Sequence, residues 1–203
     1  WLISVIILAV IQGLTEFFPV SSSGHLVVAE SFFKLTDELS RSGSILFELA
    51  VHLGTLGAVV IFYRERIISI LDTIRGWVAG GFKIRDELRV DLEFLLYLVV
   101  GSLPAAVVGL FFRDRISGLF DSPSAASVLL VATGIFLLLG KDRGSDLQLT
   151  WKSALVIGVA QAIAIMPGCS RSGWTITTAL LLGIGFRKAA EYSFLLSIPP
   201  ITF

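Results

Sequence analysis

The sequence predicts an all-α membrane protein, a polytopic helix bundle, and three observations support this prediction. The 203 residues are 55% hydrophobic and only 16% charged. Their mean hydropathy of +0.86 is higher than a water-solvated surface of this size tolerates. Several apolar runs approach the length that crosses a hydrocarbon core. Two further apolar stretches are interrupted near their middles by Pro, Gly and Ser, as in two half-helices joined by a loop.

The uninterrupted apolar stretches are predicted to be full membrane spans. They cover about residues 47–63, 94–112, 125–140 and 192 to the end of the chain. The interrupted stretches are residues 1–33 and 151–184. Non-helical backbone survives at membrane depth only where it is buried in protein or lines a polar cavity. Both interrupted stretches are therefore predicted to be re-entrant helix-loop-helix hairpins.

The charged residues orient these segments. Basic residues crowd the connection from Arg64 to Asp91, which the positive-inside rule places in the cytoplasm, as an amphipathic segment at the membrane interface. Counting spans onward brings Lys141, Arg143 and Lys152 to the same side. The first hairpin then enters from outside and the second from the cytoplasm, with their tips meeting near the midplane. This is an inverted-topology repeat, an arrangement found in many transporters.

Similar spacings in the two halves support a repeat. Gln12 precedes Pro19 by seven residues, and Gln161 precedes Pro167 by six. Each proline is followed three residues later by a serine, and shortly afterwards by a Ser-Gly pair. The chain is therefore expected to form a single transmembrane domain, residues 1–203, with a first repeat of about 1–140 and an incomplete second repeat of about 151–203.

Gln12 and Glu16 are the first residues that suggest chemistry. They are four residues apart and share a helix face, and Glu16 lies in an otherwise apolar run. A carboxylate buried in this way is costly unless it pairs or binds a cation. Two interpretations stay open. The pair forms a hydrogen bond that packs the helix, or it serves as a proton relay or as ligands for a hard cation such as Mg²⁺ or Ca²⁺, which favours oxygen.

The first loop, Pro19-Val-Ser-Ser-Ser-Gly-His25, places hydroxyl groups, N–H groups and an imidazole at the start of a half-helix. Such a helix end suits a phosphate group. Ser22 and His25 have the chemistry of a nucleophile and its proton-transfer partner. The alternative is that the three serines only cap the helix that follows.

The second loop, Pro167-Gly-Cys-Ser-Arg-Ser-Gly173, carries Arg171 between two apolar half-helices. A guanidinium in this place indicates an anionic partner. Arginine binds phosphate oxygens bidentately, and the flanking hydroxyl and N–H groups would complete a cradle for them. The alternative is a structural ion pair of Arg171 with Glu16 or Glu48, which would not exclude phosphate binding.

Other residues give weaker signals. Glu48 and His52 share a helix face, and they either line a cavity or satisfy each other. Cys169 is interpreted as a small apolar filler, because no second thiol accompanies it. No zinc-ligand spacing, Walker loop or dinucleotide fingerprint is present, and no basic patch indicates a nucleic-acid partner.

Two motifs resemble the undecaprenyl-diphosphate phosphatase family, also called the bacitracin-resistance protein family. They are Gln12-Gly-Leu-Thr-Glu-Phe-Phe-Pro-Val-Ser-Ser-Ser-Gly-His25 and Pro167-Gly-Cys-Ser-Arg-Ser-Gly-Trp-Thr175, and the resemblance continues through Phe47-Glu48, Leu103-Pro104 and Glu191-Tyr-Ser-Phe-Leu-Leu196. It implies a multi-pass enzyme of the plasma membrane that hydrolyses a polyprenyl diphosphate to the monophosphate and inorganic phosphate. This reaction recycles the carrier lipid of cell-wall polymer synthesis, uses Mg²⁺ or Ca²⁺, and confers bacitracin resistance.

Matching positions in the family motifs imply a role for each site residue. The catalytic group is Glu16, Ser22, His25 and Arg171. The diphosphate-binding group is Ser21, Ser23, Gly24, Ser170, Arg171, Ser172, Gly173 and Thr175. The metal ligands are Glu16 and, more weakly because its amide is neutral, Gln12. Glu48 and Glu191 support the site.

Several questions stay open at the level of sequence. The nucleophile is Ser22, which we favour, or His25 or water. The lipid tail is expected between helices and open to the membrane lipids. The competing function is a transporter or flippase of lipid-linked or small anions. The oligomeric state is undetermined, a homodimer being one arrangement.

Overall fold

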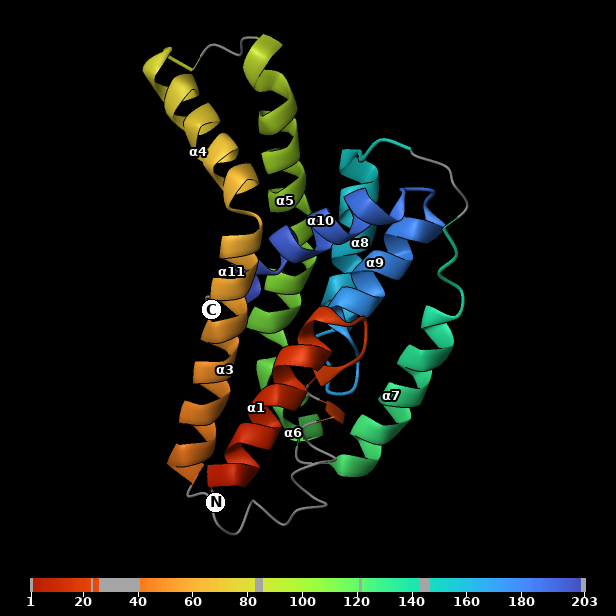
Figure 1. Cartoon of the computed structure of the whole chain (residues 1–203). Helices are drawn as coiled ribbons and strands as arrows, with labels where there is room; N and C mark the ends of the chain where they lie inside the picture. The colour runs from red at the N-terminus through yellow and green to blue at the C-terminus, as the bar shows by residue number, and fades with distance from the viewer. Residues whose placement is uncertain are drawn as a thin grey trace.

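The computed structural model describes residues 2–22, 24–25, 41–82, 86–120, 122–142 and 147–201, and its regular structure in these ranges is helical (Figure 1). The predicted all-α fold class is therefore confirmed. The helices are α1 (Leu2–Phe17), α3 (Arg41–Phe62), α4 (Arg64–Ala79), α5 (Asp86–Phe111), α6 (Arg113–Phe120), α7 (Pro123–Leu137), α8 (Trp151–Ile163), α9 (Arg171–Leu181), α10 (Phe186–Leu196) and α11 (Ile198–Ile201).

Three of the four predicted spans correspond to single helices, α3, α5 and α7. The fourth, expected from residue 192 onward, is wrong as a single helix. Helix α10 begins at Phe186 and ends at Leu196, and the short α11 follows. The cause is Pro199 and Pro200, since proline has no N–H to donate to the preceding turn.

Each interrupted stretch contains a helix that ends at a polar loop. Helix α1 ends at Phe17, and the chain resumes helical backbone where the N–H of His25 donates to the Ser21 carbonyl over 3.1 Å. Residues 26–40 lie outside the described ranges. Helices α8 and α9 are joined by residues 164–170, in which Gly168 has φ +87°, a value that favours glycine. A helix-loop-helix is therefore present in the second stretch.

The core lies where α8, α9 and α10 pack together and against α5 (Figure 1). A Cβ added to Gly158 of α8 would lie 2.3 Å from the Gly101 carbonyl oxygen of α5. The two helix backbones thus touch through glycines, as small residues allow between membrane helices. Tyr192 of α10 extends across this contact, and its hydroxyl donates to the Tyr97 carbonyl over 2.6 Å.

The outer surface of the bundle is apolar. Within the described ranges, Leu88–Phe111 of α5 is the one helical segment that is both long and apolar enough to cross a membrane, with a mean hydropathy of 2.2. Residues 52–62, α7 and α8 are shorter apolar helices. Large side chains such as Phe62, Leu110 and Phe111 are 79–80% exposed. A surface of this kind is expected where lipid replaces water as the solvent.

Candidate active site

The two polar loops lie directly against each other. A Cβ added to Gly24 of the first loop would be 2.8 Å from the Cα of Gly168 in the second. A Cβ added to Gly173 would be 2.8 Å from the Pro19 carbonyl oxygen. The hydroxyl of Ser172 donates to the carbonyl of Phe18 over 3.4 Å. Glycine at these positions therefore permits the close approach, and the loops meet as the sequence predicts.

Glu16 joins the residues of the two loops. Its Oε1 accepts from Nη2 of Arg171 over 2.8 Å. Its Oε2 accepts from the Ser22 hydroxyl over 2.5 Å and from Nε2 of Gln12 over 3.1 Å. The structural ion pair weighed for Arg171 is thus present, with Glu16 as its partner. It uses one of the five N–H groups of the guanidinium.

His25 takes a different orientation from the one its spacing suggested. Its Nδ1 lies 2.6 Å from the carbonyl oxygen of Ser21. A carbonyl can only accept, so Nδ1 carries the hydrogen, and Nε2 of the neutral ring keeps its lone pair. The His25 side chain is exposed, and the Ser22 hydroxyl is directed to Glu16 instead. The Ser22–Glu16 bond was not anticipated, because it crosses the end of α1.

The remaining phosphate-binding candidates occupy distinct places. Ser21 and Ser170 both cap: their hydroxyls accept from the N–H groups of Gly24 and Gly173, over 3.1 and 3.0 Å. Thr175 is fully buried, donates to the Arg171 carbonyl over 2.8 Å, and lies 2.5 Å from the Ser193 hydroxyl of α10. Ser23 lies outside the described residues.

Of the two acids expected to support the site, only Glu191 has a described side chain. The Glu48 side chain lies outside the described residues. Glu191 pairs with Arg66 of α4 over 3.2 Å, and Arg66 also pairs with Asp91 of α5 over 2.6 Å. Glu191 therefore belongs to an ion-pair cluster between α4, α5 and α10. Cys169 is buried, as expected of a filler.

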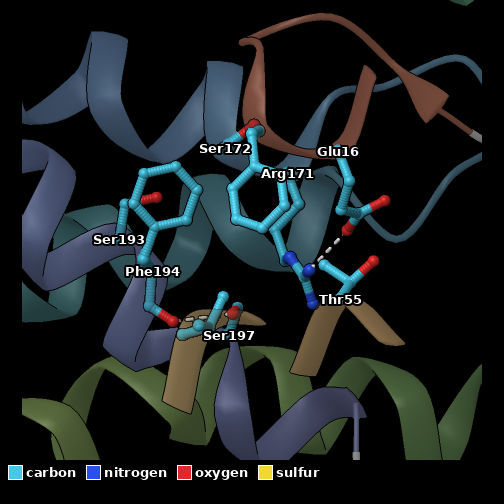
Figure 2. A pocket seen from close by; sticks show the side chains of 9 residues that line it. Glu16, Thr55, Arg171, Ser172, Ser193, Phe194 and Ser197 are labelled. Atoms are coloured by element: carbon cyan, nitrogen blue, oxygen red, sulfur yellow. Dashed lines mark hydrogen bonds and ion pairs between the residues drawn. The ribbon is translucent and has the colours of Figure 1, made fainter. Parts of the chain in front are cut away.

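A small pocket opens beside the Glu16–Arg171 pair (Figure 2). It is lined by Glu16, Phe17, Thr55, Val59, Arg171, Ser172, Ser193, Phe194 and Ser197. Figure 2 shows the Arg171 guanidinium directed toward the Glu16 carboxylate, with Thr55 beside it. The hydroxyl groups that Thr55, Ser193 and Ser197 bring to the pocket were not identified from the sequence. The available signal was the spacing of Ser193 and Ser197, which are four residues apart and share a helix face.

The residues around Glu16 fit a hard divalent cation. Oε1 of Gln12 is buried and has no hydrogen-bond partner, and the Glu16 carboxylate adjoins the same amide. An unpaired amide oxygen next to a carboxylate is a donor set that Mg²⁺ or Ca²⁺ favours. Nowhere in the described ranges do three or more His, Cys, Asp or Glu side chains form a metal-binding group. Water and substrate oxygens would therefore complete the coordination.

The model of one protein family, described as bacitracin resistance protein BacA, matches residues 5–203. The chain is 39% identical over 206 residues to undecaprenyl-diphosphatase 1 of Pseudoalteromonas translucida, covering 99% of this chain and 73% of the relative. It is 41% identical over 201 residues to the undecaprenyl-diphosphatase of Mycobacterium ulcerans, covering 97% and 70%. For the undecaprenyl-diphosphatase of Methanococcus vannielii, the identity is 41% over 200 residues, covering 97% and 74%. The chain therefore belongs to the bacitracin resistance protein family, the family that its two motifs resemble.

Proposed function

We propose that this protein is an undecaprenyl-diphosphatase, an integral membrane enzyme that hydrolyses undecaprenyl diphosphate to the monophosphate and inorganic phosphate. The family match over residues 5–203 and the relatives of that name, 39–41% identical, support the proposal. The observation that carries it is the cluster of Arg171, Glu16 and Ser22 where the two loops meet. It combines a group that binds phosphate, a carboxylate and a hydroxyl nucleophile.

Arg171 binds the terminal phosphate. Its guanidinium is 23% exposed and held by Glu16, so the remaining N–H groups of its fork can meet phosphate oxygens without a change of rotamer. The first turn of α9 adds backbone N–H groups that precede any helical hydrogen bond. Ser172, which lines the pocket, adds a hydroxyl.

Ser22 attacks the terminal phosphorus. Its proton passes to Oε2 of Glu16, which already accepts from it over 2.5 Å. The bond from that phosphorus to the bridging oxygen breaks, and the polyprenyl monophosphate leaves. Water then attacks the phosphoserine and gives a proton to Nε2 of His25. The bond from phosphorus to the Ser22 oxygen breaks, Glu16 returns its proton to that oxygen, and inorganic phosphate leaves. Direct attack by water is the alternative.

A divalent cation belongs to the proposal as well. Gln12 and Glu16 are the residues that would hold Mg²⁺ or Ca²⁺, and the ion would offset the negative charge of the diphosphate oxygens. The protons of the two steps are held and moved by Glu16 and His25.

The inverted arrangement in the membrane is also proposed. The two hairpins enter a plasma membrane from opposite faces, and each repeat contributes one loop to the site. The repeated spacing of Gln, Pro and Ser-Gly supports this arrangement, as does the direct contact of the loops at Gly24 and Gly168.

Phosphate release tests the function. Purified protein in detergent, given undecaprenyl diphosphate with Mg²⁺ or Ca²⁺, is expected to release inorganic phosphate, and a chelator is expected to stop it. Arg171→Ala should lower kcat/KM by at least about a hundredfold. Arg75→Ala is the matched control, since that arginine lies on α4, is 79% exposed and pairs with Asp72 in the preceding turn.

The competing transporter function predicts a different outcome. In that case wild-type protein would release no phosphate with any cation, while liposomes containing the protein would show movement of the lipid. Trapping a phosphoserine at Ser22 would support the covalent route. Labelled water oxygen in the released phosphate after one turnover, without a trapped intermediate, would support direct attack.

A further inference from the structure

Four aromatic rings form a continuous row that begins at the pocket. The Phe17 and Phe194 ring centroids are 5.9 Å apart, those of Phe194 and Tyr63 are 6.2 Å apart, and those of Tyr63 and Phe62 are 4.9 Å apart. Phe17 and Phe194 line the pocket beside Glu16. The aromatic row, Phe17–Phe194–Tyr63–Phe62, thus connects α1, α10 and the end of α3.

The two inner rings of this row are less exposed than the rings at its ends. Phe17 is 40% exposed, Phe194 and Tyr63 are half-buried, and Phe62 is 79% exposed beside Ile61, which is 65% exposed. The row therefore starts at the charged Glu16–Arg171 pair and ends on the apolar outer surface. Figure 1 shows this end of α3 next to α11 and the junction with α4.

The α3 face that lines the pocket changes character in the same direction. Thr55, Val59 and Tyr63 are spaced four residues apart and so share one face of the helix. Thr55 and Val59 line the pocket, and the Tyr63 ring contacts the Phe194 ring at a tilt in the aromatic row. The face thus passes from a hydroxyl group to an aliphatic side chain and then to an aromatic ring. A ligand with a charged head and a hydrocarbon tail fits this sequence of surfaces.

We propose that the aromatic row binds the first isoprene units of the lipid substrate and leads its chain from the phosphate pocket to the bilayer between α3 and α10. This inference rests on the proposed hydrolase function, and it adds where the hydrocarbon chain of the substrate lies. The tail must leave a polar pocket without exposing hydrocarbon to hydroxyl and charged groups. Rigid rings provide a large apolar contact area at a low cost in side-chain entropy.

Chain length provides the test. Phosphate release is measured with geranyl diphosphate and with undecaprenyl diphosphate for two variants. Phe194→Ala removes the ring at the pocket and should raise KM about tenfold for both substrates. Phe62→Ala removes the outermost ring and should raise KM about threefold for undecaprenyl diphosphate alone, because the geranyl chain is too short to reach it. The kcat of both variants should stay within about twofold of wild type.

Phe111→Ala is the matched control. Phe111 of α5 is also 79% exposed but is absent from the row, so its removal should leave both KM values unchanged. The inference is overturned if Phe62→Ala and Phe111→Ala change the KM for undecaprenyl diphosphate equally. It is also overturned if folded Phe194→Ala, or its conservative counterpart Phe194→Leu, keeps the wild-type KM for both substrates. Failure of the hydrolase function itself would look different, since wild-type protein would then release no phosphate from either substrate.

Discussion

Glu16 makes hydrogen bonds with Gln12, Ser22 and Arg171, and these bonds explain how α1 carries a carboxylate in an apolar run. Its side chain is only 11% exposed. A charge removed from water to this extent needs both an ion pair and hydrogen bonds. A buried charge left without its partner lowers the folding stability by about 3–5 kcal/mol. The same pairing places the Arg171 guanidinium and the Ser22 hydroxyl on opposite oxygens of the Glu16 carboxylate.

The cation site can be tested at Gln12. Replacing its amide in Gln12→Glu adds a carboxylate next to Glu16, and the affinity of oxygen sites for divalent cations rises with ligand charge. We expect the Mg²⁺ concentration for half-maximal phosphate release to fall about tenfold. Gln148→Glu, in the exposed loop before α8, is the control for added charge. A Gln12→Glu variant that needs as much Mg²⁺ as wild type would argue against this site.

The motif residues could be predicted from the sequence because their chemistry stands out against apolar neighbours. Arg171 and Glu16 were recognised in this way, and their pairing was one of the alternatives. Thr55 and Ser193 were not recognised, because single hydroxyl groups in apolar helices are common and they reach the pocket only through packing between distant segments. The bond from Ser22 to Glu16 was missed for another reason, since it crosses the end of α1, where helical spacing no longer relates the two side chains.

Helices and loops are positioned by glycines at their contacts. In Gly24→Ala, the new Cβ would lie 2.8 Å from the Gly168 backbone and 2.9 Å from Leu130, so the two loops must separate. A displacement of this size between groups that act together should lower kcat/KM by about a hundredfold. Gly13→Ala in α1 has open space around its Cβ and should keep wild-type activity. Wild-type kcat/KM for both variants would contradict the close contact of the loops.

The contact between α5 and α8 can be tested by stability. Gly158→Ala would normally favour the helix, but here the methyl group meets the Gly101 carbonyl oxygen at 2.3 Å. Overpacking of this kind costs about 1–3 kcal/mol. We expect a lower midpoint of thermal unfolding in detergent. Gly109→Ala of α5 meets nothing within 4 Å and should not lower it. Equal midpoints for the two variants would show that the helices do not pack through these glycines.

The helices could be predicted from hydropathy where the apolar run was long and ended at polar residues, as at α3, α5 and α7. The last helices could not, since the run that contains α10 and α11 is apolar throughout. Its division depends on Pro199 and Pro200, whose effect is on backbone hydrogen bonds and not on hydropathy.

The whole molecule is proposed to cross the membrane with α4 and the start of α8 on the cytoplasmic side. The buried Cys169 gives little background for cysteine labelling. Arg75→Cys of α4 and Lys152→Cys of α8, both at exposed positions, should react with a membrane-impermeant maleimide only after the membrane is opened. Ser124→Cys, exposed at the start of α7, should react in intact cells. Labelling of Ser124→Cys and Arg75→Cys from the same side would contradict the topology.

For the whole molecule, the sequence was enough to predict an all-α membrane bundle whose two loops meet, because composition and motif spacing are properties of the entire chain. The path proposed for the lipid tail could not be predicted. It rests on the relative placement of Phe17 of α1, Phe194 of α10 and Tyr63 between α3 and α4, which share no sequence pattern.

The central claim is that the two loops form one site for hydrolysis, and a double-mutant cycle tests it most directly. Phosphate release from undecaprenyl diphosphate is measured for Glu16→Gln, Arg171→Lys and the variant with both changes. If both groups act in the same step, each single change should lower kcat/KM by about a hundredfold or more, and the double variant should be little worse than either. Wild-type kcat/KM in either single variant, or losses that simply multiply in the double variant, would contradict a site shared between the loops.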